Sequence, residues 1–158
     1  MRLAVGDLVV YGSHGAGAIV ARRTRDLFGN RQVVVVLALA GGLSVELPLA
    51  RADTFLRPIA DQTEITRVHD VLSAAAVPSD VPWLKRRRDE LAKLQTTVGL
   101  AEIIRDATGR QEARGPLSPS ESELFRRARN LLATEIALAL DIELSDATDW
   151  IDQQLSES

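Results

Sequence analysis

The chain contains no cysteine among its 158 residues, which excludes disulfide bonds and thiolate metal sites. This absence fits a reducing compartment, and we expect a cytoplasmic protein. No apolar run reaches the roughly 18 residues needed to cross a bilayer, so no membrane span is predicted. An acid at Asp7 precedes any long apolar run, and the N-terminus therefore does not resemble a secretion signal.

Groups that commonly carry catalysis are also scarce. His14 and His69 are the only histidines, and neither has a carboxylate cluster nearby in sequence, so a metal site or a histidine base is not predicted. No serine lies in a nucleophile-elbow pattern. The glycine-rich stretch 12–17 lacks the Lys–Ser/Thr ending of a P-loop and is interpreted as a tight β connection. We expect a protein that is not an enzyme and has no cofactor.

Charge is low in total but unevenly distributed. The net charge is −3. Residues 1–60 contain seven arginines against four acids, residues 61–115 are balanced, and residues 116–158 contain three arginines against nine acids. A protein that coats DNA with a uniformly basic surface is therefore not expected. Any contact with nucleic acid must be local, and we expect another partner to assist it.

The first third of the chain consists of short β-forming runs separated by turn residues. Runs at 8–11, 18–24, 32–40, 43–47 and 54–57 predict five strands. Gly29 and Asn30 suit a hairpin turn, and Gly41 with Gly42 suits another. Short strands with tight turns favour a small, strongly bent antiparallel sheet or a partial barrel.

The apolar spacing becomes helical after Pro58. Ile65, Val68 and Leu72 fit one face of a first helix. Further helices are predicted around residues 84–98, 100–107, 118–138 and 145–155, with Ser118 and Glu121 as a capping pair and Glu135 on an inward or partly inward side. The chain is therefore assigned to the α+β class, with a β module at residues 1–58 and an all-α module at residues 62–158.

One of only six aromatic residues stands beside the strongest basic cluster. Trp83 and Leu84 are followed by the four consecutive cations Lys85 to Arg88. Cations neutralise phosphates, and a flat ring can stack on a base or wedge into a base step. Nucleic acid is one interpretation of this pairing; a solvated cationic face beside a packed tryptophan is the other.

The apolar spacing of this helix predicts which side is buried. Leu84, Leu91 and Leu94 define the expected buried stripe, and Trp83 lies about 100° from Leu84, at the edge of the stripe or beyond it. Asp80 is the predicted helix cap, with a proline tolerated in the first turn.

Arginines also gather on the second predicted strand and its end. Arg22, Arg23 and Arg25 are interpreted either as charges that protect a sheet edge from aggregation or as part of an edge that docks on a protein partner.

Several short motifs resemble, in the right order, the CarD/CdnL proteins and the polymerase-binding module of transcription-repair coupling factors. In chain order these motifs are Val5-Gly6-Asp7, Val9-Val10-Tyr11, His14-Gly15-Ala16, Leu43 to Pro48 with Ala52 and Asp53, Pro82-Trp83 with Lys85, Arg86 and Leu91 to Leu94, and Leu124, Ala128, Arg129, Leu132, Glu135, Ala137 and Leu138. The likeness covers nearly the whole chain.

The resemblance implies a Tudor-like β module that docks on the β subunit of bacterial RNA polymerase. It implies a helical module that lies against promoter DNA near the upstream edge of the transcription bubble and stabilises the open complex. Trp83 matches the family's DNA wedge, and Lys85, Arg86 and Arg88 match its basic DNA-contacting helix. Arg25 matches a basic position at the polymerase contact. We expect such a regulator to act as a monomer.

At Glu46 the chain differs from the family that it resembles, whose members typically carry a basic residue at this position. A reversed charge at the polymerase-facing site, which also includes Arg23 and Arg25, predicts weaker docking, docking elsewhere, or a diverged paralogue. Arg22 and Arg23 offer compensating charge. Two alternatives stay open: a protein–protein adaptor that binds no nucleic acid, and an independent binder of double-stranded DNA, against which the net charge of −3 argues.

Overall fold

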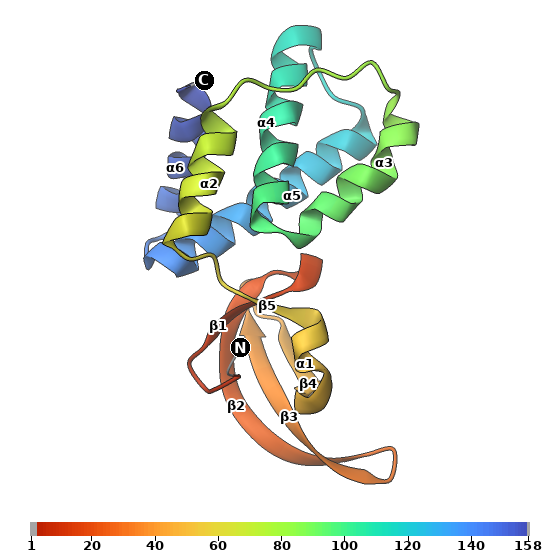
Figure 1. Ribbon diagram of the computed structural model, residues 1–158, viewed down its shortest axis with the longest axis vertical. Helices are drawn as coiled ribbons and strands as arrows, with labels where there is room; N and C mark the ends of the chain where they lie inside the picture. The colour runs from red at the N-terminus through yellow and green to blue at the C-terminus, as the bar shows by residue number, and fades with distance from the viewer. Residues whose placement is uncertain (1–2, 158) are drawn as a thin grey trace. The chain divides into compact units, whose positions relative to one another are not determined.

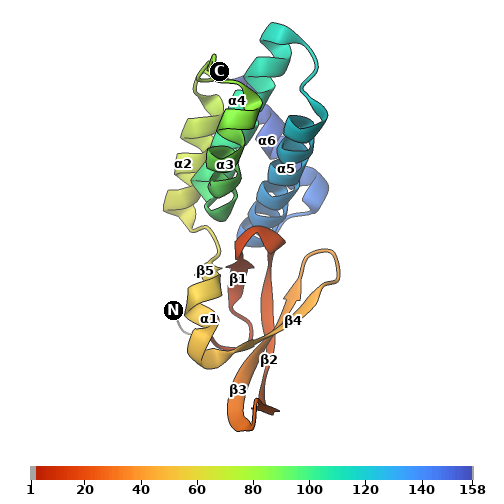
Figure 2. The same cartoon turned by 90° about the vertical axis from the view of Figure 1, so that its right-hand side faces the viewer.

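The computed structural model describes residues 3–157, and the chain divides into two compact units, Met1–Ile59 and Ala60–Ser158. They are called the β unit and the helical unit below. Figures 1 and 2 show the strands gathered in the first and the long helices in the second.

The β unit is one antiparallel sheet of five strands, as the sequence predicts. In chain order the strands are β1 (Leu8–Tyr11), β2 (Ala16–Leu27), β3 (Asn30–Leu39), β4 (Ser44–Pro48) and β5 (Leu56–Pro58). They are hydrogen-bonded in the order β4-β3-β2-β1-β5. A single helical turn, Gly12–His14, lies in the glycine-rich stretch between β1 and β2. That stretch is therefore a β connection, in keeping with the Tudor-like module.

A short helix, α1 (Leu49–Phe55), was missed by the sequence reasoning, which placed a strand near residues 54–57. The helix has no side-chain cap, so it carries no sequence signal of its own. It forms because Ala52 is fully buried against one face of the sheet, together with Val35, Leu37 and Leu47. Tertiary packing commonly decides the state of such short segments.

β2 and β3 form a long curved hairpin (Figure 1) that ends in a two-residue turn. Leu27 pairs with Asn30, and the two residues between them both have positive φ, 53° at Phe28 and 79° at Gly29. Positive φ at both central positions defines a type I′ turn, which suits Asn-Gly far better than an aromatic residue. The side chain of Phe28 is 99% exposed, so no packing compensates for its backbone conformation.

The helical unit contains five α-helices, which are α2 (Gln62–Ser73), α3 (Trp83–Ala92), α4 (Thr97–Arg114), α5 (Pro119–Leu140) and α6 (Leu144–Ser156). Three of them begin at side-chain caps. Asp61 accepts a hydrogen bond from the Glu64 amide at 2.9 Å, and Thr96 accepts one from the Gly99 amide at 2.9 Å. The predicted cap Ser118 accepts one from the Glu121 amide at 3.3 Å. Each cap satisfies an amide that the helix leaves unpaired.

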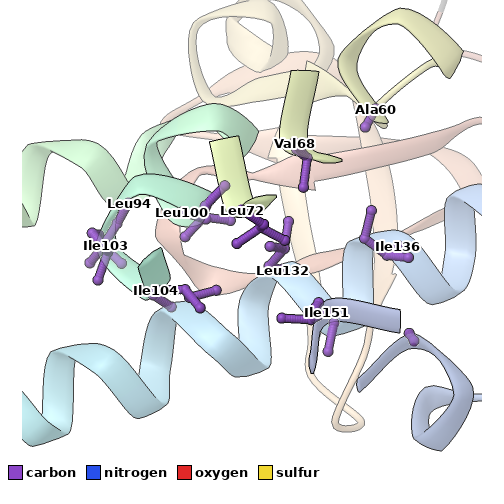
Figure 3. Close-up of a cluster of buried hydrophobic side chains, with 14 of the residues drawn as sticks. Ala60, Val68, Leu72, Leu94, Leu100, Ile103, Ile104, Leu132, Ile136 and Ile151 are labelled. Atoms are coloured by element: carbon purple, nitrogen blue, oxygen red, sulfur yellow. The ribbon is translucent and has the colours of Figure 1, made fainter. Parts of the chain in front are cut away.

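The core of this unit is aliphatic (Figure 3). Leu72, Ile104 and Leu132 converge there from α2, α4 and α5, and α6 adds Ile151. All four side chains are fully buried, which confirms the helical periodicity expected for their segments.

One acid is embedded beside this core. The side chain of Glu135 on α5 is 1% exposed. Its Oε2 accepts hydrogen bonds from the Ala60 amide at 2.9 Å and from the Thr97 hydroxyl at 3.1 Å. The inward position expected for Glu135 is confirmed, and the carboxylate ties the start of the unit and α4 to α5.

No helix in the described part of the chain is both long and apolar enough to traverse a bilayer.

Candidate nucleic-acid interface

The basic helix α3 begins at Trp83. The segment before it, residues 74–82, contacts α4. The amide of Val77 donates to Oδ1 of buried Asp106 at 3.0 Å. A Cβ on Gly109 would lie 2.4 Å from the Cβ of Ala76, so the glycine permits the close approach. In Figure 1 the segment leaves α2, crosses α4 and reaches the start of α3. Contacts to α4 therefore fix the path of the segment that leads into the basic helix.

The predicted cap of α3 is wrong. Pro82 occupies the cap position without a side-chain hydrogen bond, and its carbonyl accepts from the amides of Lys85 and Arg86 at 3.0 and 3.2 Å. Asp80 lies two residues too early and instead pairs with Arg114 at 3.5 Å. The Cδ of Pro82 clashes with helical backbone at the residue before it, so Asp80 and Val81 stay outside the helix, which starts at Trp83.

The expected leucine stripe of α3 is confirmed at Leu91 and Leu94 but is wrong at Leu84. Leu84 is 87% exposed, whereas Glu90 and Leu94 are buried. Trp83 and Leu91 pack half-buried against the helical core. At the start of the helix the inward position is therefore occupied by Trp83 and not by Leu84, which lies about 100° further around the helix.

Trp83 also lines a groove between α3 and the first turns of α5. The groove has a volume of about 210 Å³. Its walls are Trp83, Arg87, Leu91, Ser120, Glu123, Leu124 and Arg127. The indole Nε1 is buried and has no hydrogen-bond partner among the residues that the structure describes. Trp83 thus stands at the border between the core and a groove open to solvent, and part of the residue remains accessible.

The four consecutive cations are not equivalent. The Arg86 side chain is only 13% exposed and pairs with Glu121 at 3.5 Å. Lys85, Arg87 and Arg88 are exposed and make no ion pair with any side chain in residues 3–157. Lys85 and Arg88 are three residues apart and lie on one side of the helix. In the sequence these four charges form one cluster. In the structure only three of the four are free to contact a phosphate.

Leu84 is a surface residue of this site that the sequence analysis missed, because it was assigned to the core. It is one turn from Arg88, at spacing i, i+4, on the outward side of the helix. A helical repeat that starts at Trp83 would have shown this. That repeat places one face of the helix at Trp83, Arg86, Glu90 and Leu94, and Leu84 lies outside it.

The structure brings the predicted polymerase-contacting residues together on one face of the sheet. Arg25 Nη2 lies 2.9 Å from Glu46 Oε1, and Arg23 Nη1 lies 3.7 Å from the same oxygen. Arg22 is on the opposite face, because it pairs with core residue Val35 while Arg23 pairs with Val34. Glu46 therefore partly neutralises the two arginines of its own surface.

Comparison with known proteins agrees with this architecture. The model of the CarD-like/TRCF RID domain matches residues 3–60, and the model of the CarD C-terminal domain matches residues 67–152. A Bacillus subtilis (strain 168) protein titled "Putative transcription factor YdeB" is 24% identical over 136 residues, which span 84% of this chain and 88% of that protein. With both domains matched in order, the chain belongs to the CarD/CdnL family of transcription regulators.

Proposed function

We propose that this protein docks on the β subunit of bacterial RNA polymerase through its β unit and stabilises the promoter open complex through α3. It acts as a cytoplasmic monomer, and its DNA site is the upstream edge of the transcription bubble. The observation that carries the proposal is the arrangement on α3: a half-buried tryptophan lies beside exposed cations that no acid within residues 3–157 neutralises. The match of residues 3–60 to the CarD-like/TRCF RID domain supports RNA polymerase as the partner.

Each part of α3 has a separate task in this mechanism. Lys85 and Arg88 contact phosphates and hold the helix in register on the duplex, without reading sequence. Trp83 inserts its accessible edge at a distorted minor-groove step, and the exposed Leu84 adds apolar contact beside it. The helix is basic only locally, so docking on polymerase supplies the effective concentration that it needs near DNA.

Stabilisation of the open complex follows from differential binding. If the protein binds the open state more tightly than the closed state, the equilibrium moves toward the open state by that difference. A preference of about 1.4 kcal/mol changes the ratio of the two states tenfold. No chemical step is required, in keeping with a regulator rather than an enzyme.

The lifetime of a promoter open complex tests the wedge. Trp83→Ala is expected to shorten the lifetime while leaving polymerase binding intact, because the substituted residue lies in the helical unit. Trp150→Phe is the matched control, since it alters the other tryptophan. An unchanged lifetime in a Trp83→Ala protein that keeps its helical circular dichroism rejects the wedge.

Polymerase affinity tests the docking surface separately. Arg25→Glu is expected to weaken co-purification with polymerase, because it reverses a charge on the face that carries Glu46. Arg22→Glu makes the same charge change on the opposite face and is expected to have little effect. Equal affinity of wild type and Arg25→Glu removes Arg25 from the contact. Glu46→Arg shows whether the native acid weakens docking or redirects it.

The packing of Trp83 against the helical core favours a second candidate, an adaptor that binds proteins but no nucleic acid. In that case Trp83 serves only to hold α3 in place. Titration of a Trp150→Phe protein with forked promoter DNA separates the two functions. A change in Trp83 emission supports the DNA-bound regulator, and constant emission supports the adaptor.

A further inference from the structure

Arg86 is held by two other segments of the helical unit. Its Nε donates to the carbonyl of Val81 at 2.8 Å, and its Nη2 lies 3.5 Å from Oε1 of Glu121. Glu121 stands in the first turn of α5, where Ser118 caps its amide. The guanidinium is therefore held at Nε by the Val81 carbonyl and at Nη2 by the Glu121 carboxylate.

The same carboxylate is shared with a second arginine. Arg110 of α4 contacts Glu121 Oε2, and the side chains of both arginines are 13% exposed, against 8% for Glu121. One buried acid thus joins α3, α4 and α5. We call Arg86, Glu121 and Arg110 the buried ion cluster. Removal of the shared acid leaves two guanidinium groups facing each other in a poorly solvated place, which is strongly unfavourable.

The cluster reaches the tryptophan through Arg86. The Arg86 guanidinium carbon lies 5.4 Å from the centroid of the Trp83 ring, a distance at which a cation attracts an aromatic face. The indole Nε1 makes no hydrogen bond within residues 3–157. With no hydrogen bond to orient it, the ring depends on apolar packing and on the guanidinium that lies over it.

We propose that the buried ion cluster is a positioning device for Trp83, and that Arg86 sets the angle of the ring rather than contacting a DNA phosphate. The orienting role stands on the geometry of the helical unit alone. Its consequence for DNA rests on the proposed function. Arg86 is thereby separated from Lys85 and Arg88, which are the phosphate contacts.

Fluorescence of Trp83 tests the orienting role without DNA. In a full-length Trp150→Phe protein, Arg86→Lys keeps the charge but loses the planar group that stacks on the indole. Glu121→Gln keeps the shape but loses the charge that holds Arg86. Both variants are expected to shift Trp83 emission to longer wavelength and to increase quenching by acrylamide. Arg88→Lys, on the exposed side of the same helix, is the matched control and is expected to change neither.

Unchanged emission and quenching in both Arg86→Lys and Glu121→Gln overturns the positioning role. Circular dichroism is recorded for each variant, because a change in Trp83 counts only in a protein that keeps its helices. If Glu121→Gln unfolds, Arg86→Lys alone decides, since it retains both charges of the pair.

Salt dependence of binding to forked DNA tests the second half of the proposal. Arg88→Gln is expected to reduce the slope of log affinity against log salt by about one, as the loss of a phosphate contact does. Arg86→Gln is expected to weaken binding with the slope unchanged. A slope reduced equally in both variants makes Arg86 a phosphate contact and overturns the assignment. Failure of the wild type to bind forked DNA rejects the proposed function, while the fluorescence result still decides the orienting role.

Discussion

The β unit and the helical unit place their charged side chains in opposite ways. Every buried polar or charged side chain in residues 3–157 belongs to the helical unit, namely Glu90, Thr97, Asp106, Glu121, Glu135 and Gln154. The ion pairs of Glu46 in the β unit instead lie in solvent, with side-chain exposures of 40% for Glu46 and 47% for Arg25.

The difference follows from how each unit satisfies its backbone. A sheet pairs its amides and carbonyls strand to strand, so its side chains can keep charge at the surface. A helical bundle leaves unpaired amides at every helix start and in its connections. In this protein, Glu135 and Asp106 supply the acceptors for amides of that kind. We therefore expect substitution of an acid to be costly in the helical unit where it is buried, and nearly neutral in the β unit.

The largest effect is expected from Glu135→Ala. The substitution leaves the Ala60 amide and the Thr97 hydroxyl without their acceptor and opens a cavity, so the free energy of unfolding should fall by about 3 kcal/mol. Urea unfolding followed by helical circular dichroism measures it. Glu135→Gln, which retains an acceptor oxygen of similar reach, should lose clearly less. Equal losses in the two variants contradict the hydrogen-bonding role.

A gain of stability is expected in the β unit from Phe28→Asn. The substitution creates the Asn-Gly pair that a type I′ turn favours and relieves a strained left-handed aromatic residue, which should add about 1 kcal/mol to the free energy of unfolding. Thermal unfolding of the sheet measures it. Phe28→Ala removes the same exposed ring without supplying asparagine and should show little gain. If the alanine variant is as stable as the asparagine variant, the ring and not the turn is responsible.

Glu46→Gln is the surface counterpart of Glu135→Ala. Both partners of the Arg25 pair are exposed to solvent, so its loss should change the free energy of unfolding by less than about 0.5 kcal/mol. Urea unfolding at low and high salt measures the change, which should shrink as salt screens the pair. A loss above about 1 kcal/mol would mean that this surface charge is structural, and the contrast between the units would fail.

The smallest effect is expected at His69. It tests whether the stability cost of replacing a charged side chain depends on its burial or on the unit in which it lies. The side chain of His69 in the helical unit is 43% exposed, and its hydrogen bonds to Asp70 and then to Glu157 raise the pKa of its ring above the usual 6.5. A raised folded pKa means that the folded protein binds the proton more tightly than the unfolded chain. The stabilisation is therefore complete below about pH 6.5 and disappears as pH rises through the folded pKa.

The melting temperatures of wild type and His69→Asn, compared across that pH range, measure the effect. The difference should be small, largest in acid and absent at alkaline pH. A difference that stays constant with pH assigns the role of His69 to packing instead.

Local patterns were sufficient for most of the fold. The five strands and their hairpin turns follow from short apolar runs between turn residues, and the cap Ser118 marks a helix start because a cap acts within three residues. Helix α1 could not be predicted in this way, because it depends on Ala52 packing against strands elsewhere in the chain. The expectation for Leu84 was wrong for a related reason: leucine spacing alone put Leu84 inside, whereas Trp83 and Arg86 occupy that side at the start of α3.

The sequence by itself determined the α+β order, the family motifs and the place of the tryptophan beside four cations, since these depend on neighbours along the chain. Only the tertiary structure decided which of those cations are free. Glu121 lies on a different helix and draws Arg86 inward, because a buried carboxylate needs a compensating charge. Glu46 likewise occupies Arg23 and Arg25 from another strand. The availability of a charge depends on its partners in space, and these are invisible in the order of residues.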